Sequence, residues 1–269
     1  MLKGFKERPI GIFDSGVGGL TVMKEIICQL PKENILYLGD TARVPYGTRS
    51  PETVLRYSHE NARFLIARGI KILVVACNTS SSVALSSLRE KYPLPIIGVV
   101  EPGARAAVQM SRQKKIAVIG TETTIKSGSY EKAIKYFEVS AEVSGVSCPL
   151  FVPLIEEGWH EGDVVTLTAK KYLSSVTDNG ADTLVLGCTH YPMIKNIIED
   201  IVGINLIDSA VETAKEVKQI LTEQDMLCED RVEAFREFFV TDFPEKFIKI
   251  GERFLEHRIE NISNIQLGN

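Results

Sequence analysis

The stretch LVLGCTHYP, residues Leu184 to Pro192, repeats in outline the stretch ILVVACNTSS, residues Ile72 to Ser81. In both, an apolar run of strand length gives way to a small residue, a cysteine and then a threonine close behind. Short apolar runs that end at turn residues are typical of strands buried in a parallel sheet. Each copy therefore predicts a strand with a thiol just past its end, Cys77 in one case and Cys188 in the other.

A second pair of similar segments accompanies the first, and we call each such pair an echo. RPIGIFDSG, from Arg8, resembles KKIAVIGTE, from Lys114, as a strand followed by a polar turn. The two echoes occur in the same order and at nearly the same separation, which indicates two related halves. Ligands bind beyond the carboxyl ends of the strands in open parallel sheets. If the halves face each other, Cys77 and Cys188 approach one ligand from opposite sides.

The rest of the chain alternates short apolar runs with amphipathic segments of helix length, which is the pattern of βαβ units in α/β proteins. Predicted strands are Ile10–Phe13, Ile35–Leu38, Ile72–Ala76, Ile96–Val99, Ile116–Ile119, Leu184–Leu186 and Asn205–Ile207. Predicted helices are Gly19–Leu30, Pro51–Arg68, Ser80–Lys91, Gly162–Asn179 and Ser209–Gln224. Ser50 is the expected N-cap of the helix that Pro51 begins.

Charge and composition exclude several classes of protein. The 269 residues include 31 basic and 35 acidic ones, with no basic block, so nucleic acid is not an expected partner. No apolar run reaches the roughly 18 residues of a membrane span, and the N-terminus lacks a signal-peptide core. We therefore expect a cytoplasmic protein with no membrane partner.

The five cysteines include no CxxC pair, and a disulfide framework is not expected in a reducing compartment. Three of them match no motif and are predicted to be packing residues, since a free cysteine is usually a small buried hydrophobe: Cys28, Cys148 and Cys228.

Three kinds of chemistry compete for the motif cysteines. Cys188 and His190 could bind zinc together with Cys77, but the close ligand pairs of structural zinc sites are absent. A hydrolase would need a base and an orienting group beside the thiol, and there is no GxSxG or cysteine-protease signature. Proton transfer uses both thiols: one group removes a proton from one face of a carbon and the other delivers a proton to the opposite face.

The turn DSGVGG, from Asp14 to Gly19, raises the possibility of a dinucleotide loop, with Asp40 as the ribose-binding acid. Thr21 stands in place of the third glycine of that motif, so the signal is weak. The same residues are compatible with a tight turn in which Asp14 or Ser15 caps the helix.

Taken together, DSGVGGLTV (Asp14 to Val22), GDTARVPYG (Gly39 to Gly47), ACNTSS (Ala76 to Ser81) and GCTHYP (Gly187 to Pro192) resemble the motifs of the glutamate racemases of bacterial cell-wall synthesis. The resemblance covers nearly the whole chain and is weakest after about Cys228. One departure is Ser80, which stands where alanine is common.

The resemblance implies two similar parallel-sheet α/β domains, related by a pseudo-twofold axis, with the active site in the cleft between them. It places residues 1–98 plus 207–269 in the first domain and residues 99–206 in an inserted second domain. It implies no cofactor and no metal, glutamate as the small-molecule substrate, and a homodimer. The product, D-glutamate, would supply peptidoglycan synthesis and so support cell-wall biogenesis and cell shape.

The resemblance also implies roles for single residues. Cys77 would act on the D-isomer and Cys188 on the L-isomer, with Asp14 assisting the first thiol and His190 and Glu156 the second. The implied substrate contacts are Asp14, Ser15, Tyr46, Gly47, Asn78, Thr79, Thr189 and His190. Two other readings stay open: a racemase of aspartate, another acidic amino acid or a hydantoin, and an amino-acid-binding protein without catalysis.

Overall fold

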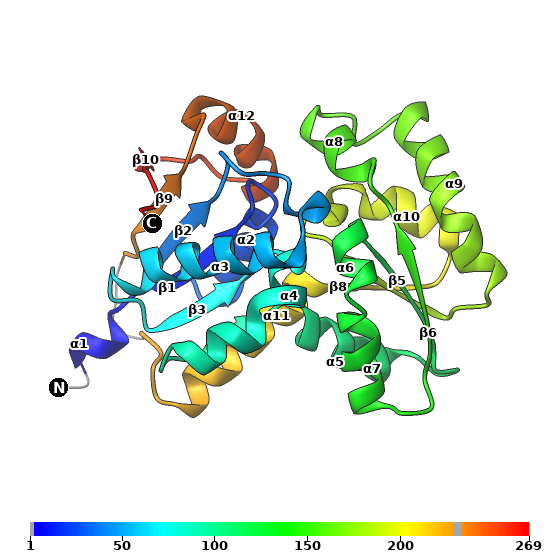
Figure 1. Ribbon diagram of the computed structural model, residues 1–269, viewed down its shortest axis with the longest axis horizontal. Coiled ribbons are helices and arrows are strands. Elements are labelled where there is room, and N and C mark those ends of the chain that lie inside the picture. The colour runs from blue at the N-terminus through cyan, green and yellow to red at the C-terminus, as the bar shows by residue number, and fades with distance from the viewer. Residues whose placement is uncertain (1–2, 229–232, 269) are drawn as a thin grey trace.

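The computed structural model describes residues 3–228 and 233–268. Residues 1–2, 229–232 and 269 of the predicted first domain lie outside these ranges. Two sheets, in which every paired strand is parallel, lie side by side with helices around each (Figure 1). The protein is therefore an α/β protein of two parallel-sheet units, as the sequence predicts.

The larger sheet has the order β10-β9-β2-β1-β3-β4 and the smaller one the order β6-β5-β7-β8. The strands of the larger sheet are β1 (Ile10–Asp14), β2 (Ile35–Gly39), β3 (Ile72–Val75), β4 (Ile96–Gly98), β9 (Arg236–Val240) and β10 (Ile262–Asn264). Those of the smaller sheet are β5 (Lys115–Gly120), β6 (Glu142–Ser147), β7 (Thr183–Gly187) and β8 (Asn205–Asp208).

The two sheets share one strand order, because β2-β1-β3-β4 corresponds to β6-β5-β7-β8 position by position. Ile10 of β1 pairs with Ile72 of β3, and the matching Ile116 of β5 pairs with Thr183 of β7. The echoes in the sequence are thus the strands β1 and β5 and the strands β3 and β7. Cys77 and Cys188 follow equivalent strands of the two sheets.

Helices cover the sheets and pack across the junction between them. Nearest the junction, α2 packs against α11, and α5 packs against both α7 and α11. The α-helices are α1 (Lys3–Lys6), α2 (Leu20–Gln29), α3 (Pro51–Ile66), α4 (Asn78–Lys91), α5 (Val100–Met110), α6 (Glu122–Lys126), α7 (Ser129–Phe137), α8 (Phe151–Glu156), α9 (Asp163–Asp178), α10 (Lys195–Val202), α11 (Ser209–Glu223) and α12 (Pro244–Leu255). Two short 3-10 helices are η1 (Tyr46–Thr48) and η2 (Tyr191–Ile194).

The predicted helices and strands are all present, with ends that differ by one or two residues. Ser50 caps α3 as predicted, because its side chain accepts a hydrogen bond from the N–H of Thr53 at 3.3 Å. The chain leaves the larger sheet after β4 and returns to it at β9. The domain limits at residues 99 and 206 stay a prediction, and the second limit falls inside β8.

The cysteine predictions have mixed outcomes. Cys148 is buried, as expected of a packing residue, and Cys228 is half-buried. The prediction for Cys28 is wrong, because this residue lies on the outer face of α2 and is exposed.

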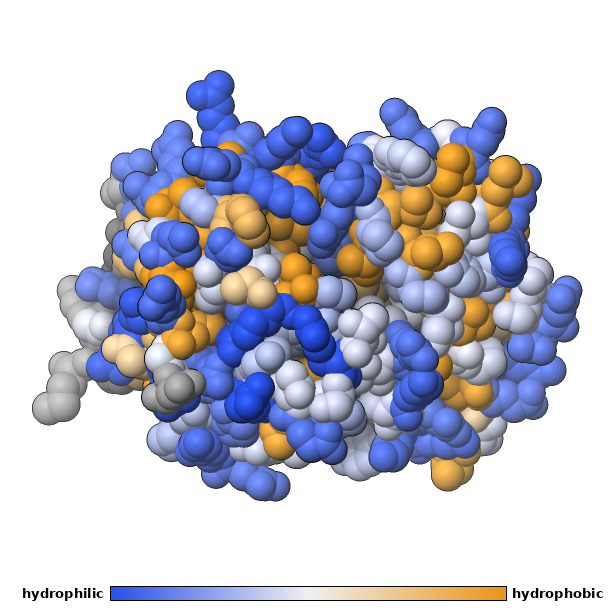
Figure 2. Space-filling view, turned by 45° about the horizontal axis from the view of Figure 1, so that its top comes forward, coloured by the Kyte–Doolittle hydropathy of each residue, from blue (hydrophilic) through white to orange (hydrophobic). Residues whose placement is uncertain are grey.

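Two properties of the surface bear on partners. Within the described residues, no helix combines the length and the apolar character needed to cross a lipid bilayer. Hydrophilic side chains dominate the face in Figure 2, and apolar ones show between them on both halves, including a group on the half with α8 and α9. Exposed apolar residues in that region are Leu150, Trp159, Val164 and Leu167.

Candidate active site

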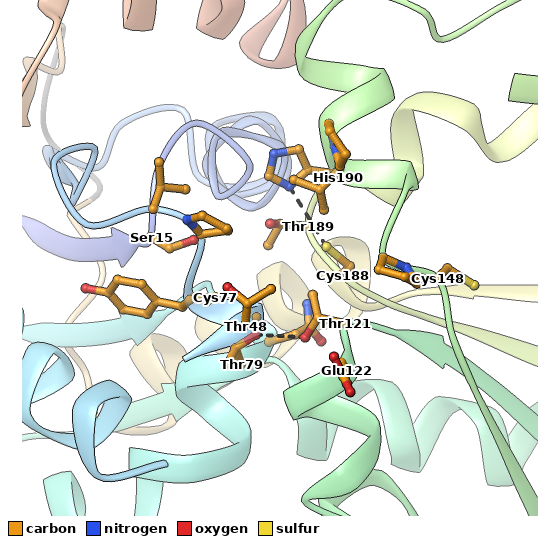
Figure 3. A pocket seen from close by; sticks show the side chains of 18 of the residues that line it. Ser15, Thr48, Cys77, Thr79, Thr121, Glu122, Cys148, Cys188, Thr189 and His190 are labelled. Atoms are coloured by element: carbon orange, nitrogen blue, oxygen red, sulfur yellow. Dashed lines mark hydrogen bonds between the residues drawn. The ribbon is translucent and has the colours of Figure 1, made fainter. Parts of the chain in front are cut away.

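The two motif thiols line one pocket between the sheets. Cys77 follows β3 and Cys188 follows β7, and their side chains are 5% and 6% exposed. The pocket has a volume of about 350 Å³, and both halves of the chain contribute to its walls (Figure 3). A buried thiol therefore reaches the same small cavity from each half.

Cys77 is the N-cap residue of α4, so the first N–H groups of that helix lie beside it. Burial, and next the charge of Asp14, raise the pKa of Cys77 to about 12. Asp14 is itself fully buried, and burial raises its pKa against the opposing effects of His190 and the N–H of Gly16. The structure thus favours a protonated thiol at Cys77.

Cys188 has a different set of neighbours. Its sulfur lies 3.9 Å from Nδ1 of His190, and Nε2 of His190 lies 3.0 Å from a carboxylate oxygen of Glu156. Burial lowers the pKa of His190, but the hydrogen bonds with Cys188 and Glu156 outweigh it and raise the pKa to about 10. A protonated imidazole held by a carboxylate is suited to stabilising negative charge on the sulfur beside it.

The turn after β1 explains why the motif DSGVGG needs a glycine at position 18. A β-carbon on Gly18 would lie 2.3 Å from Oγ1 of Thr189 and 2.5 Å from Nδ1 of His190. The hydroxyl of Thr21, one turn on, also lies within 3.0 Å of the backbone oxygen of Thr189. The first sheet's turn and the CTHYP motif are therefore in direct contact.

Hydroxyl and amide groups fill the opposite wall. Oγ1 of Thr79 lies 3.0 Å from Oγ1 of Thr121 and 3.3 Å from Oγ1 of Thr124. The amide oxygen of Asn78 accepts a 2.6 Å hydrogen bond from the hydroxyl of Tyr130. These contacts join the start of α4 to the second half of the chain and fix the polar groups that face the cavity.

The segment between β2 and α3 forms part of the pocket wall. Tyr46 is almost fully buried, and its hydroxyl donates to the carboxylate of Asp40, which also accepts a 2.6 Å hydrogen bond from Nε of Arg43. Oγ1 of Thr123 donates to the backbone oxygen of Gly47 at 2.8 Å. Asp40, proposed above as a possible ribose ligand, is thus occupied in holding this segment.

Most residues predicted for the site lie together. The pocket is lined by Ser15, Tyr46, Gly47, Cys77, Asn78, Thr79, Glu156, Cys188, Thr189 and His190. Asp14 is the exception, because it lies buried beneath the turn and is not part of the pocket lining. Its carboxylate accepts a hydrogen bond from the N–H of Gly16, and the N-cap of α2 is Gly19, so the predicted capping by Asp14 or Ser15 is wrong.

Several lining residues were not foreseen: Val44, Pro45, Thr48, Thr121, Glu122, Cys148, Pro149, Val152 and Pro153. Thr121 could have been found, because it follows the predicted strand Ile116–Ile119 as Ser15 follows the predicted strand Ile10–Phe13. Cys148 carries no such signal, and Figure 3 shows its sulfur directed away from the cavity.

The described lining residues include acids but neither lysine nor arginine. An anion in this pocket would therefore be held by hydroxyl, amide and backbone N–H donors and by His190. In the part of the chain that the structure describes, no group of three or more histidine, cysteine, aspartate and glutamate side chains is arranged to hold a metal ion.

Comparisons with known proteins bear on this pocket. A family model described as Asp/Glu/Hydantoin racemase matches residues 10–217. The chain is 52% identical to a glutamate racemase of Geobacter metallireducens over 97% of each chain. It is similar to the crystal structure of a Francisella tularensis glutamate racemase in complex with D-glutamate, with a TM-score of 0.93, 39% identity and coverage of 97% and 98%. A Bacillus anthracis glutamate racemase structure gives a TM-score of 0.94 at 42% identity, with the same coverage.

Proposed function

This chain belongs to the Asp/Glu/Hydantoin racemase family, and from that premise we propose that it interconverts L-glutamate and D-glutamate through Cys77 and Cys188. The class of enzyme is thereby set as an isomerase that acts on an amino acid. The observation that carries the two-thiol proposal is the position of the sulfurs. Each follows the equivalent strand of its own sheet, and both line one pocket.

The proposed reaction consists of two proton transfers. In the direction from L-glutamate, the thiolate of Cys188 takes the α-proton, so that a C–H bond breaks and an S–H bond forms. The electron pair stays on the α-carbon, in conjugation with its carboxyl group. The thiol of Cys77 then delivers its proton to the other face. The reverse direction begins with Cys77 as the base, and neither direction requires a cofactor.

The neighbours of each thiol support this division of roles. The raised pKa of Cys77 keeps a proton on that sulfur, ready for delivery to the intermediate. Beside Cys188, the imidazole of His190 is held protonated by Glu156 and can stabilise a thiolate. Asp14 lies behind Cys77 and acts on this thiol without facing the cavity.

We propose that neutral donors recognise the two carboxylates of glutamate. Ser15, Asn78, Thr79 and Thr189 supply hydroxyl and amide groups, and the start of α4 supplies N–H groups with the favourable end of the helix dipole. Tyr46 and Gly47 close the pocket from the first half. Shape and directed hydrogen bonds would then distinguish glutamate from the shorter aspartate and from hydantoins.

The wider role is also a proposal. By likeness to the bacterial enzymes, the product D-glutamate would enter peptidoglycan, and the protein would act in the cytoplasm as a homodimer. The exposed apolar side chains around α8 and α9 offer a surface that a second copy could cover. Light scattering coupled to gel filtration measures the mass directly, and a monomer across the working concentration range would exclude the dimer.

The test of the reaction is incubation of the metal-stripped protein with L-glutamate in D2O. We expect loss of optical rotation together with deuterium at the α-carbon, and much slower exchange with L-aspartate or a hydantoin. Binding of glutamate by calorimetry without exchange would instead favour a binding protein.

Cysteine variants test the mechanism in the same assay. Cys77→Ser and Cys188→Ser should each lower turnover by about 100-fold or more, because each removes one acid/base group. Cys28→Ser is the control, since Cys28 is exposed and does not line the pocket. Undiminished racemisation by either pocket variant would exclude the two-thiol mechanism.

A further inference from the structure

Ser80 has a buried hydroxyl that lacks a partner. The residue lies in the first turn of α4, three positions after Cys77, and its side chain is fully buried. Its Oγ has no hydrogen-bond partner within residues 3–228 and 233–268. Buried polar groups are nearly always hydrogen-bonded, so a hydroxyl in this state requires a physical reason.

The next residue shows what an ordinary buried serine does at this place. The hydroxyl of Ser81 donates to the backbone oxygen of Val75 at 2.7 Å and accepts from the N–H of Val99 at 3.2 Å. These bonds tie the start of α4 to strand β3 and to the residue that follows β4. The hydroxyl of Ser80 makes no comparable bond, so support of the backbone does not account for it.

Helix geometry gives the Ser80 hydroxyl a different neighbour. The side chain of an N-cap residue lies beside the third residue of the helix, because it is placed to accept from the N–H of that residue, and Ser80 is the third residue of α4. The N-cap of α4 is Cys77, whose sulfur lines the pocket. The unpartnered hydroxyl and the thiol therefore belong to the same turn of helix.

The protonation state of Cys77 decides whether a bond forms. A neutral thiol is a weak acceptor, whereas a thiolate is a charged and strong one. Burial and the charge of Asp14 raise the pKa of Cys77, while the N–H and the hydroxyl of Ser80 act in the opposite direction. The hydroxyl therefore gains a strong acceptor when the sulfur loses its proton.

We propose that Ser80 is a further catalytic residue, whose hydroxyl donates a hydrogen bond to the sulfur of Cys77 when that sulfur is a thiolate. The inference rests on the proposed function in naming the step served, which is removal of the α-proton of D-glutamate. In that step the C–H bond breaks and the S–H bond of Cys77 forms. The proton of Ser80 stays on its oxygen, and its hydrogen bond is released as the sulfur becomes neutral.

The size of the effect follows from one hydrogen bond to a charged acceptor. Loss of such a bond lowers the thiolate fraction of Cys77 by about tenfold at a pH below its pKa. An alanine, which the motif pattern of the resemblance leads us to expect at this place, would lack the donor. The chain therefore carries one more stabilising group beside Cys77 than that pattern supplies.

The experiment compares Ser80→Ala with Ser81→Ala in the full-length protein. Iodoacetamide is added at pH 8, and alkylation of the Cys77 and Cys188 peptides is followed by mass spectrometry. We expect Ser80→Ala to slow alkylation of Cys77 by about tenfold and to leave Cys188 within about twofold of the wild-type rate. Ser81→Ala should leave Cys77 within about twofold, because its hydroxyl bonds only to the backbone.

A second variant and a second measurement complete the experiment. Ser80→Thr keeps the donor and should retain most of the reactivity of Cys77, which covers the case in which the alanine variant does not fold. In turnover, Ser80→Ala should increase the primary deuterium isotope effect with D-glutamate labelled at the α-carbon.

Equal rates for Cys77 in the wild-type protein and in Ser80→Ala would overturn the inference. So would an equal slowing of Cys77 and Cys188, which would indicate a general change in the pocket. Alkylation needs no turnover. A protein that fails to exchange the α-proton of glutamate would therefore disprove the proposed function, but the alkylation rates would still test the hydrogen bond between Ser80 and Cys77.

Discussion

Replacement of Gly18 by alanine should lower the activity of the protein strongly, although it removes no functional group from the pocket. The added β-carbon would lie 2.3 Å from Oγ1 of Thr189 and 2.5 Å from Nδ1 of His190, about 1 Å short of ordinary contact. Gly18 does not have a positive φ, so alanine can adopt its backbone and the effect comes from this contact. His190 must therefore move relative to Cys188.

The magnitude follows from two separate costs. Misplacement of a catalytic group by about 1 Å lowers turnover by about 100-fold. Crowding of a packed interior by one methyl group costs about 1–3 kcal/mol of folding free energy. We expect kcat/KM for glutamate to fall by about 100-fold in Gly18→Ala, with a protein that remains folded by circular dichroism.

Gly11→Ala is the matched control. Its β-carbon would meet Cδ1 of Ile70 at 2.6 Å, which is similar crowding at the other end of β1, away from the pocket. Urea unfolding should show comparable destabilisation in the two variants, while the control keeps its kcat/KM. If Gly18→Ala retained activity within about threefold, or Gly11→Ala lost as much, the argument from contact with His190 would be refuted.

Two further changes test the charged groups. Glu156→Gln should lower the pKa of His190 from about 10. The imidazole is protonated below its pKa and loses its proton as pH rises through it, so in this variant the alkaline limb of the pH–rate profile should move to lower pH. Glu157→Gln, at an exposed neighbouring residue, should leave the alkaline limb where it is in the wild-type protein. Lys71→Met should lower the free energy of unfolding, measured in urea, by about 3–5 kcal/mol, because the buried carboxylate of Glu33 loses the ammonium group 2.5 Å away. A further Glu33→Gln change should restore part of that free energy. Unchanged stability of the single variant would contradict the argument.

The central strands could be predicted because their sequences are nearly pure apolar runs. The runs from Ile72 and from Leu184 stop at the carboxyl ends of β3 and β7. Ligands bind beyond the carboxyl ends of parallel strands, and this rule places Cys77 and Cys188 correctly at the pocket. The rule fixes which edge of the sheet a residue occupies, but it does not fix the direction of the side chain. Asp14 therefore reaches the right edge and yet lies beneath the turn.

Strands β6 and β9 could not be predicted from local sequence. β9 begins with Arg236 and Glu237 and has only three buried residues, and it pairs with β2, which lies about two hundred residues earlier in the chain. β6 has no buried residue and contains a glycine. Both depend on tertiary pairing that a short window of sequence does not contain.

The two thiols have unequal surroundings, but this difference cannot favour one direction of the proposed reaction over the other. Cys77 has Asp14 and Ser80 as neighbours, whereas Cys188 has His190 and Glu156. Mirror-image products have identical free energies in water, so kcat/KM must be equal in the two directions whatever surrounds either sulfur. The asymmetry can only divide that common value differently between kcat and KM. The net direction of flux in a cell would then follow from the supply and removal of the two enantiomers alone.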